Sequence, residues 1–402
     1  MRRKYIKYLL YIMITGLVVL SVGCSNRTQK TENRDLTIDV ALYPYVPDMA
    51  RFRDVVSSEW EKIHPDIDLH FADWDCYVSA PEPALDVFVF DGIYLTSFVN
   101  EGYLLPISDE MIQNKEDIFP FALEGCKCND TIYALPQLLC TDFLYTRKDD
   151  TALCDVSDVT KLYDILGDRK ERSVIPKENE GLLIDLSGGL LTKTMMYMDA
   201  LMDERQEYTD YSELPETSNL SSNALAQIDA LWKMGGEKQV EYQPDNNDTY
   251  IRARWFAEGK GRAYIGYSEA MATMGDYADN VTIRRFSYGT KKDIPLFYTD
   301  MVGINSKISE EKKELAFELA NILTSEKMLT EMNTPTTEDD YPQYLLTARE
   351  SVYDTLGKSY PIYNTLKEIV DSTDNHVYRL GNNAGQFLEN MEKELSEQMV
   401  RD

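Results

Sequence analysis

Cys140 is the residue of this chain best placed for covalent chemistry. It lies between two strand-like runs, 131–135 and 143–146, just after a Pro-Gln break, in the sequence YALPQLLCTDFLYTRK. The chain has only three histidines, which are far apart and show no metal-ligand spacing: His64, His70 and His376. A nucleophilic cysteine at this place would therefore need a carboxylate rather than an imidazole as its base.

The residues before Cys140 predict a doubly wound α/β lobe. Residues 36–43, 67–71 and 86–90 have the pattern of strands, and 48–63 carries apolar side chains at helical spacing. Ligands of such lobes bind beyond the carboxyl ends of the strands. Polar and aromatic residues follow these ends, namely Tyr43, Tyr45, Asp73, Tyr77 and Asp91.

The residues after Cys140 are predicted to be mainly helical up to residue 280, with strands following. The expected helices are 157–166, 195–204, 223–234 and 310–322, and the expected strands are 262–265, 281–286 and 296–304. The strand at 262–265 runs into Gly-Tyr-Ser-Glu, which ends at Glu269. A chain of 402 residues is long enough for two or more domains with sizeable cores.

Residues 1–23 are predicted to be a signal peptide. Basic residues precede the uncharged apolar run 8–22, which is short against the ~20 residues of a membrane span. The run leads into LSVGC, which resembles a lipobox, so Cys24 is predicted to carry a lipid and 24–35 to be a polar tether. An uncleaved membrane anchor is the alternative. We expect an exported protein that is lipid-anchored to the outer face of the cell membrane or secreted, and that meets the membrane only through its lipid.

The formal net charge of −28 excludes nucleic acid as a partner, because such a field repels phosphates. The same field concentrates small cations, although solubility is an equally good reason for it. Past Cys24 the cysteines are Cys76, Cys126, Cys128, Cys140 and Cys154. Their odd number leaves at least one thiol free, and without histidine partners they predict no zinc site.

Several stretches together resemble the two-lobed extracellular solute-binding proteins of the maltose-binding type, a periplasmic-binding-protein-like fold. They are GYLLPI, TIYALPQ, LYTRKD, WFAEGKGRAYIGYSE and DMVGINSKISEEKKELAFELANILTS. On this resemblance lobe one holds 36–138 plus 288–335 and lobe two holds 139–287 plus 336–402, with a cleft between them. A monomer is the usual state of this fold.

Within that fold the chain resembles thiaminase I, thiamine pyridinylase, over residues 36–380. The matching strings are ALYPYVPD, DWDCY, LDVFVFD, YALPQLLCTD, YIRARWFAEGKGRAYIGYSEAM, IPLFYTD and YPQYLLTAR, in this order. The resemblance implies a transferase that replaces the thiazole of thiamine with an amine or thiol co-substrate. It implies no metal or organic cofactor.

The resemblance also assigns the site residues. It makes Cys140 the nucleophile and Glu269 its acid and base. The residues implied to line the substrate site are Tyr43, Tyr45, Tyr77, Tyr250, Tyr267 and Tyr298, with Asp91 and Asp300 holding the aminopyrimidine. Taken alone, Cys140 would be a small core residue, Glu269 a partner for a helix dipole, and Asp91 a cap for a helix at Ile93.

The implied reaction suits these residue types. A thiolate that adds to the pyrimidine ring lets the ring electrons expel the neutral thiazole, and a second nucleophile then displaces the cysteine. The chief alternative function is a non-enzymatic thiamine- or cation-binding lipoprotein of an ABC importer, and a carbohydrate-binding lipoprotein is a third. A nucleophile paired with a carboxylate favours the enzyme, because a pure binder gains nothing from it.

Overall fold

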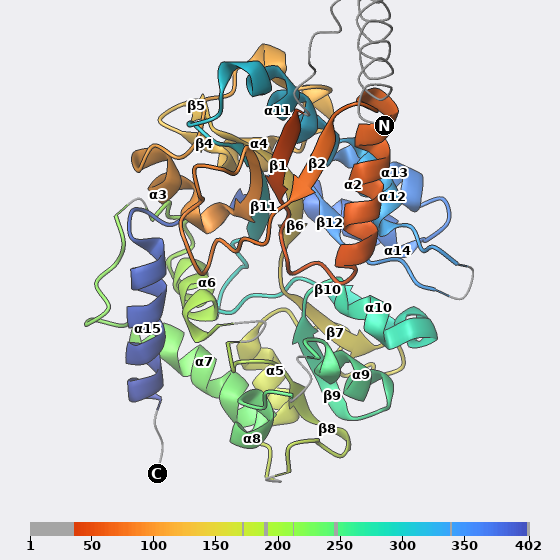
Figure 1. The fold of residues 1–402 in the computed structure, drawn as a ribbon. Coiled ribbons are helices and arrows are strands. Elements are labelled where there is room, and N and C mark those ends of the chain that lie inside the picture. Colours follow the sequence, from red (N-terminus) through yellow and green to blue (C-terminus); the bar gives the residue numbers. More distant parts are fainter. Residues whose placement is uncertain are drawn as a thin grey trace, which may run out of the picture.

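The structure is a computed structural model, and it describes residues 36–170, 173–188, 192–211, 213–244, 248–337 and 340–399. Figure 1 shows two α/β bodies, one above the other, each built on its own sheet. The predicted signal peptide, the tether and Cys24 lie outside the described residues.

The upper sheet has seven strands in the order β12-β6-β11-β3-β1-β2, with β13 pairing with β11 (Figure 1). Its strands are β1 (Thr37–Ala41), β2 (Asp68–Phe71), β3 (Val87–Asp91), β6 (Ala134–Cys140), β11 (Leu296–Ile304), β12 (Leu346–Thr347) and β13 (His376–Val377). Strand β1 runs parallel to β2 and β3, whereas β11 is antiparallel to β3 and β6. All five residues of β3 are buried, as its continuous apolar run predicts.

Helices surround the upper sheet. They are α2 (Met49–Ile63), α3 (Leu95–Asn100), α4 (Pro120–Gly125), α11 (Glu310–Leu323), α12 (Glu326–Asn333), α13 (Glu350–Leu356) and α14 (Ile362–Val370). Helix α11 packs on β1, β3, β6 and β11, with α2 and α12 beside it. The side chain of Asp48 caps α2 by accepting from the amide of Arg51. The hairpin of β4 (Lys127–Cys128) and β5 (Thr131–Ile132) precedes β6.

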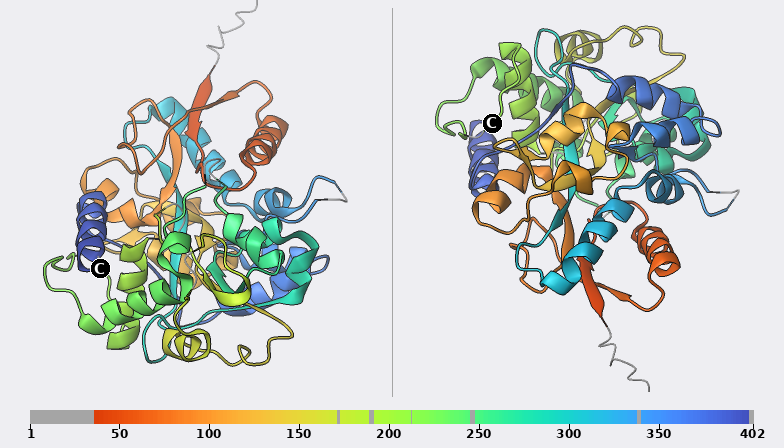
Figure 2. Two further views of the ribbon diagram at one scale, coloured as in Figure 1. Left: turned by 90° about the horizontal axis from the view of Figure 1, so that it is seen from below. Right: turned by 90° about the horizontal axis from the view of Figure 1, so that it is seen from above.

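The lower sheet has the order β10-β7-β9-β8. Its strands are β7 (Phe143–Arg147), β8 (Glu178–Leu183), β9 (Gly261–Gly266) and β10 (Val281–Arg284). Its helices are α5 (Val159–Leu166), α6 (Lys193–Arg205), α7 (Ser222–Gly235), α8 (Glu237–Val240), α9 (Ile251–Ala257) and α10 (Ala270–Met274). The last helix, α15 (Ala384–Gln398), packs against α6 (Figures 1 and 2).

The chain passes between the sheets at neighbouring places. The first crossing is only Thr141 and Asp142, between β6 and β7, and the second is 285–295, between β10 and β11. The two crossings are tied together because the hydroxyl of Thr141 donates to the carbonyl of Leu296 at 2.8 Å. Cys140 is the last residue before the first crossing, so it lies where the two bodies meet.

Strand β6 differs from the sequence prediction. The Pro-Gln pair was expected to end a strand before Cys140, yet Pro136 and Gln137 lie inside β6. The pairing register with β11 shifts here, since Asp300 pairs with Leu138 and Met301 with Pro136, which leaves Gln137 as an extra residue. A bulge accommodates a proline because the ladder there needs no amide donor.

The expected lobe boundaries stay a prediction. The pairing of β12 and β13 with the upper sheet differs from the expected assignment of all of 336–402 to lobe two. The five described cysteines are free thiols, of which Cys140 is partly exposed and Cys154 exposed. Over the described ranges, no helix is both long and apolar enough to cross a membrane.

Candidate active site

Four of the expected site residues lie together at the end of the upper sheet. In the antiparallel ladders, Asp300 of β11 stands opposite Asp91 of β3, and Tyr298 of β11 stands opposite Cys140 of β6. Residues two apart on a strand face the same side, and opposite side chains are separated by roughly 5 Å at Cβ. The sheet register therefore places Cys140, Tyr298, Asp300 and Asp91 in one group.

Asp91 uses both carboxylate oxygens. Oδ1 accepts from the amide of Ile93 at 3.0 Å, and Oδ2 accepts from the hydroxyl of Tyr77 at 2.5 Å. The Tyr77 hydroxyl is in turn 3.1 Å from that of Tyr43. Asp91 thus caps the short 3₁₀ helix Gly92–Tyr94, as its alternative interpretation predicts, and also holds a pair of tyrosines.

The tyrosines near Asp91 form an aromatic wall. The ring of Tyr45 is edge-on to Tyr43 and Tyr77, with centroids 5.3 and 5.7 Å apart, and its hydroxyl donates to Asp75 at 2.6 Å. Tyr94, which the sequence did not single out, lies edge-on to Tyr77 at 5.7 Å. Tyr45 is 54 % exposed, so the wall is open to solvent on one side. Such faces suit a flat cation.

Asp300 is a carboxyl group with raised proton affinity. Burial raises its pKa well above the usual range, and the neighbouring charges of Asp91 and Glu269 add to this. Like charges directly opposite each other in a sheet repel, so protonation of Asp300 relieves the pair. A protonated and an ionised carboxyl side by side can donate to and accept from one heterocycle.

Glu269 reaches the site from the lower body. It directly precedes α10, where the alternative of a helix-dipole partner expects it, but its side chain makes no capping hydrogen bond there. Its oxygens instead accept from the hydroxyl of Tyr250 at 3.1 Å and from that of Ser268 at 3.4 Å. Burial raises the pKa of Glu269 to about 7, against the lowering effect of these hydrogen bonds. A base with such a pKa can exchange protons in both directions at neutral pH.

Tyr267 completes the side of the site that comes from the lower body. The hydroxyl of Tyr145 in β7 donates to the backbone carbonyl of Tyr267 at 2.6 Å and so fixes the turn that carries Glu269. Tyr267 and Tyr298 are both more than nine-tenths buried, and the charges of Cys140 and Asp142 act on both of them.

The Cys140 thiol is neutral in the resting protein. Burial raises its pKa well above the usual range, and four carboxylates add to the effect, with Glu269 first, then Asp142, Asp300 and Asp91. A thiolate at this place must therefore be formed during the reaction, with a base at hand. A bound cation would offset the carboxylate field and favour the thiolate.

The structure thus brings the expected residues into one electrostatic neighbourhood, with Tyr45 at its exposed margin. Their individual roles stay predictions. Sequence reasoning missed Asp142, which is buried two residues after Cys140 and raises the pKa of Glu269. Its place two residues after the expected nucleophile was the available signal.

The architecture defines a protein of the periplasmic-binding-protein-like class, and its candidate site holds a cysteine and carboxyl groups. The solved structure of maltose-bound MalE3 of T. maritima has this fold, with a TM-score of 0.61 at 16 % identity over 90 % of this chain and 100 % of that one. The expected two-lobed α/β fold is confirmed.

The chain belongs to the thiaminase I family. It is 42 % identical to a thiaminase-1 of Paenibacillus thiaminolyticus over 391 residues, covering 97 % of this chain and 95 % of the relative. Residues 141–289 match the family model of the thiaminase-1 domain. Clostridium botulinum thiaminase I in complex with thiamin is 46 % identical, with a TM-score of 0.89 over 90 % of this chain and all of that one. Thiaminase I from Bacillus thiaminolyticus is 44 % identical, with a TM-score of 0.88 over 91 % and 100 %.

Proposed function

We propose that this enzyme of the thiaminase I family degrades thiamine by base exchange through a covalent adduct on Cys140. The observation that carries the proposal is the shared site of Cys140, Glu269 and the Asp91–Asp300 pair. The thiamin-bound relative supports thiamine as the substrate.

Glu269 removes the thiol proton as the sulfur of Cys140 adds to an electron-poor carbon of the pyrimidine. The ring electrons then break the bond between the methylene carbon and the thiazolium nitrogen, and thiazole leaves neutral. Asp91 and Asp300 stabilise the ring as it takes up electrons, through hydrogen bonds to its amino group and nitrogen. The tyrosine wall holds the cationic substrate, at about 0.5–2 kcal/mol per cation–π contact.

The second half of the reaction reverses the first. An amine or thiol co-substrate adds to the exocyclic methylene, the electron pair returns through the ring, and the carbon–sulfur bond breaks as aromaticity is restored. Glu269 returns its proton to the departing sulfur of Cys140 and can then take the proton of a co-substrate that has an N–H or S–H bond. Two moderate steps thereby replace one direct displacement at the methylene carbon.

Intact-protein mass spectrometry tests the adduct. The purified protein is mixed with thiamine without a co-substrate, and we expect a mass gain of one pyrimidinylmethyl group on Cys140 together with free thiazole. Adding aniline or pyridine should discharge the adduct. Cys140→Ser should give neither adduct nor turnover, whereas Cys154→Ser, at an exposed free thiol, should behave as the wild type.

Tight thiamine binding without release of thiazole would instead indicate the importer component. Thiazole release from the wild type with no mass gain on the protein would show exchange by direct displacement and would overturn the covalent step alone.

We further propose that the mature protein is exported and held at the outer face of the membrane by a lipid on Cys24. The support is the sequence of residues 1–24. Metabolic labelling with a radioactive fatty acid should mark the wild type and not Cys24→Ala, and the variant should be lost from the membrane fraction. Equal labelling of both would overturn the assignment.

A further inference from the structure

Base exchange releases a proton with some co-substrates and not with others. Thiamine enters as a cation and thiazole leaves neutral, so a co-substrate with an N–H or S–H bond gives a neutral product and one free proton per turnover. Pyridine has no such hydrogen, and the positive charge passes to the product instead. In the proposed mechanism, on which this inference rests, the released proton arrives on Glu269. That group is only 8 % exposed and must lose the proton before the next cycle.

A buried carboxyl group lies directly behind the nucleophile. Asp142 follows Cys140 by two residues and is 8 % exposed. Its Oδ2 accepts from the hydroxyl of Tyr288 at 3.1 Å, while within the described part of the chain Oδ1 has no hydrogen-bond partner. A buried oxygen without a donor favours a proton or a water at that place.

Three more carboxyl groups lie beyond Asp142. Oxygens of Asp199 and Asp203, one turn apart on α6, and of Asp293 are all within 4.8 Å of one another. Asp199 is 5 % exposed, and no described residue donates a hydrogen bond to its Oδ1. Asp293 lines a surface cavity of about 600 Å³ together with Arg285 and Asp158. The cluster therefore extends from the interior to water.

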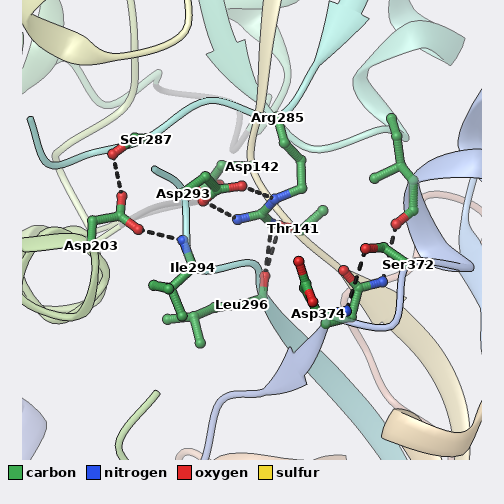
Figure 3. Close-up of polar contacts among 12 residues, drawn as sticks. Thr141, Asp142, Asp203, Arg285, Ser287, Asp293, Ile294, Leu296, Ser372 and Asp374 are labelled. Carbon is green, nitrogen blue, oxygen red and sulfur yellow. Dashed lines mark hydrogen bonds and ion pairs between the residues drawn. The ribbon is translucent and has the colours of Figure 1, made fainter. Parts of the chain in front are cut away.

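The second crossing joins Asp142 to this cluster. In Figure 3, Arg285 binds Asp293 through Nε and Nη2 at 2.8 and 2.9 Å, and the hydroxyl of Ser287 donates to Asp203 at 2.8 Å. The next residue, Tyr288, donates to Asp142, and Arg285 also contacts Thr141. Residues 285–289 of one segment thus contact Asp142, Asp203 and Asp293.

A metal ion would have to displace hydrogen bonds at two of the three carboxyl groups of this cluster. Both oxygens of Asp293 already accept from Arg285, and those of Asp203 accept from the amides of Ile294 and Gly289 and from Ser287. Burial raises the pKa of Asp142 and of Asp203 to about 6, and it raises that of Asp199 as well. The pKa values of Asp142 and Asp203 are close to that of Glu269, which lets a proton pass between these groups without a large uphill step.

We propose that Asp142, Asp199, Asp203 and Asp293 form a proton outlet that carries the proton of a protic co-substrate from Glu269 to the surface cavity. The N–H or S–H bond of the co-substrate breaks after Glu269 has returned the thiol proton to Cys140, and the new proton goes first to Glu269 and then to Asp142. The proton continues through the paired carboxyls of α6 to Asp293 and leaves to water. Where two of these groups are too far apart for direct transfer, a water molecule would have to connect them, and no electron is transferred.

The choice of co-substrate tests the outlet. Asp199→Asn is compared with the wild type in the full chain, with aniline as the protic and pyridine as the aprotic co-substrate. We expect turnover with aniline to fall about ten-fold or more and turnover with pyridine to stay unchanged. Asp86→Asn is the matched control. It replaces a carboxyl group of the upper body that is also only 5 % exposed, and it should leave both rates unchanged.

Each other result overturns the outlet. If turnover of Asp199→Asn with aniline is unchanged, Glu269 releases its proton directly to solvent. If turnover falls equally with both co-substrates, Asp199 supports the structure of the site and does not carry a proton. Unimpaired pyridine exchange also shows that the variant is folded. Failure of the proposed function is seen separately, as a wild type that releases no thiazole with either co-substrate.

Discussion

Asp91 and Asp300 stand directly opposite each other in the ladder of β3 and β11, where two carboxylates would repel. The raised pKa of Asp300 follows from its burial and from this neighbour. The raised pKa favours a proton on Asp300, and a protonated Asp300 gives the pair a donor as well as acceptors for a heterocycle.

Asp300→Asn tests this pair. The amide cannot share a proton with Asp91, and we expect kcat/KM for thiamine to fall about 10- to 100-fold, the cost of one charge-assisted hydrogen bond of roughly 1.5–3 kcal/mol. Steady-state kinetics measure it. Asp66→Asn, at an exposed position in the same body, should leave kcat/KM unchanged. If kcat/KM of Asp300→Asn equals that of the wild type, Asp300 does not contribute to the binding of thiamine.

The pH dependence of kcat/KM for thiamine reports Glu269 in the free enzyme. The base must be ionised to take the thiol proton, and its pKa is raised to about 7, so kcat/KM should rise as the pH increases through about 7. In a two-step exchange this parameter does not depend on the co-substrate. Glu269→Gln should lower kcat/KM and abolish the inflection. An inflection that persists in the variant would assign it to another group.

The same group makes stability depend on pH. The pKa of Glu269 is raised from 4.5 in the unfolded chain to about 7 in the folded one. Its contribution is therefore fully present below about pH 4.5 and is lost as the pH rises through 7. The free energy of unfolding of Glu269→Gln, relative to that of the wild type, should therefore rise by up to about 3 kcal/mol from pH 5 to pH 8. Urea unfolding at both pH values measures this, and an equal difference at both would contradict it.

The sequence predicted the strands that carry the site wherever the signal is local. A continuous apolar run ending in Asp91 predicts β3, and the range 296–304 coincides with β11 and so places Tyr298 and Asp300. The pattern failed at Pro136, because pairing on both sides and a bulge at Gln137 carry β6 past the residues that usually end a strand.

The carboxyl cluster of the proposed proton outlet could not be predicted from the sequence, because tertiary packing brings its members together. Asp199 and Asp203 one turn apart on a helix are typical of a solvated face, yet both are buried in the assembled protein, where the second crossing contacts Asp203. Tyr94 was missed likewise, since its contact with Tyr77 depends on the tertiary arrangement. Local sequence patterns predict individual helices and strands. Which of their ends come together depends on how the whole core packs, and a local pattern does not contain that information.

Tyr250→Phe separates the tuning of Glu269 from its chemistry. The Tyr250 hydroxyl donates to Oε1 of Glu269 at 3.1 Å and lowers its pKa, since a hydrogen bond to the charged form favours ionisation. Without that donor the pKa of Glu269 should rise, and the inflection in kcat/KM should move to higher pH while the rate at the alkaline plateau is largely kept. Tyr163→Phe, whose hydroxyl donates to Asp168 on the lower body, is the matched control and should leave the profile in place. An inflection that stays or moves to lower pH in Tyr250→Phe would show that this hydroxyl does not hold the base.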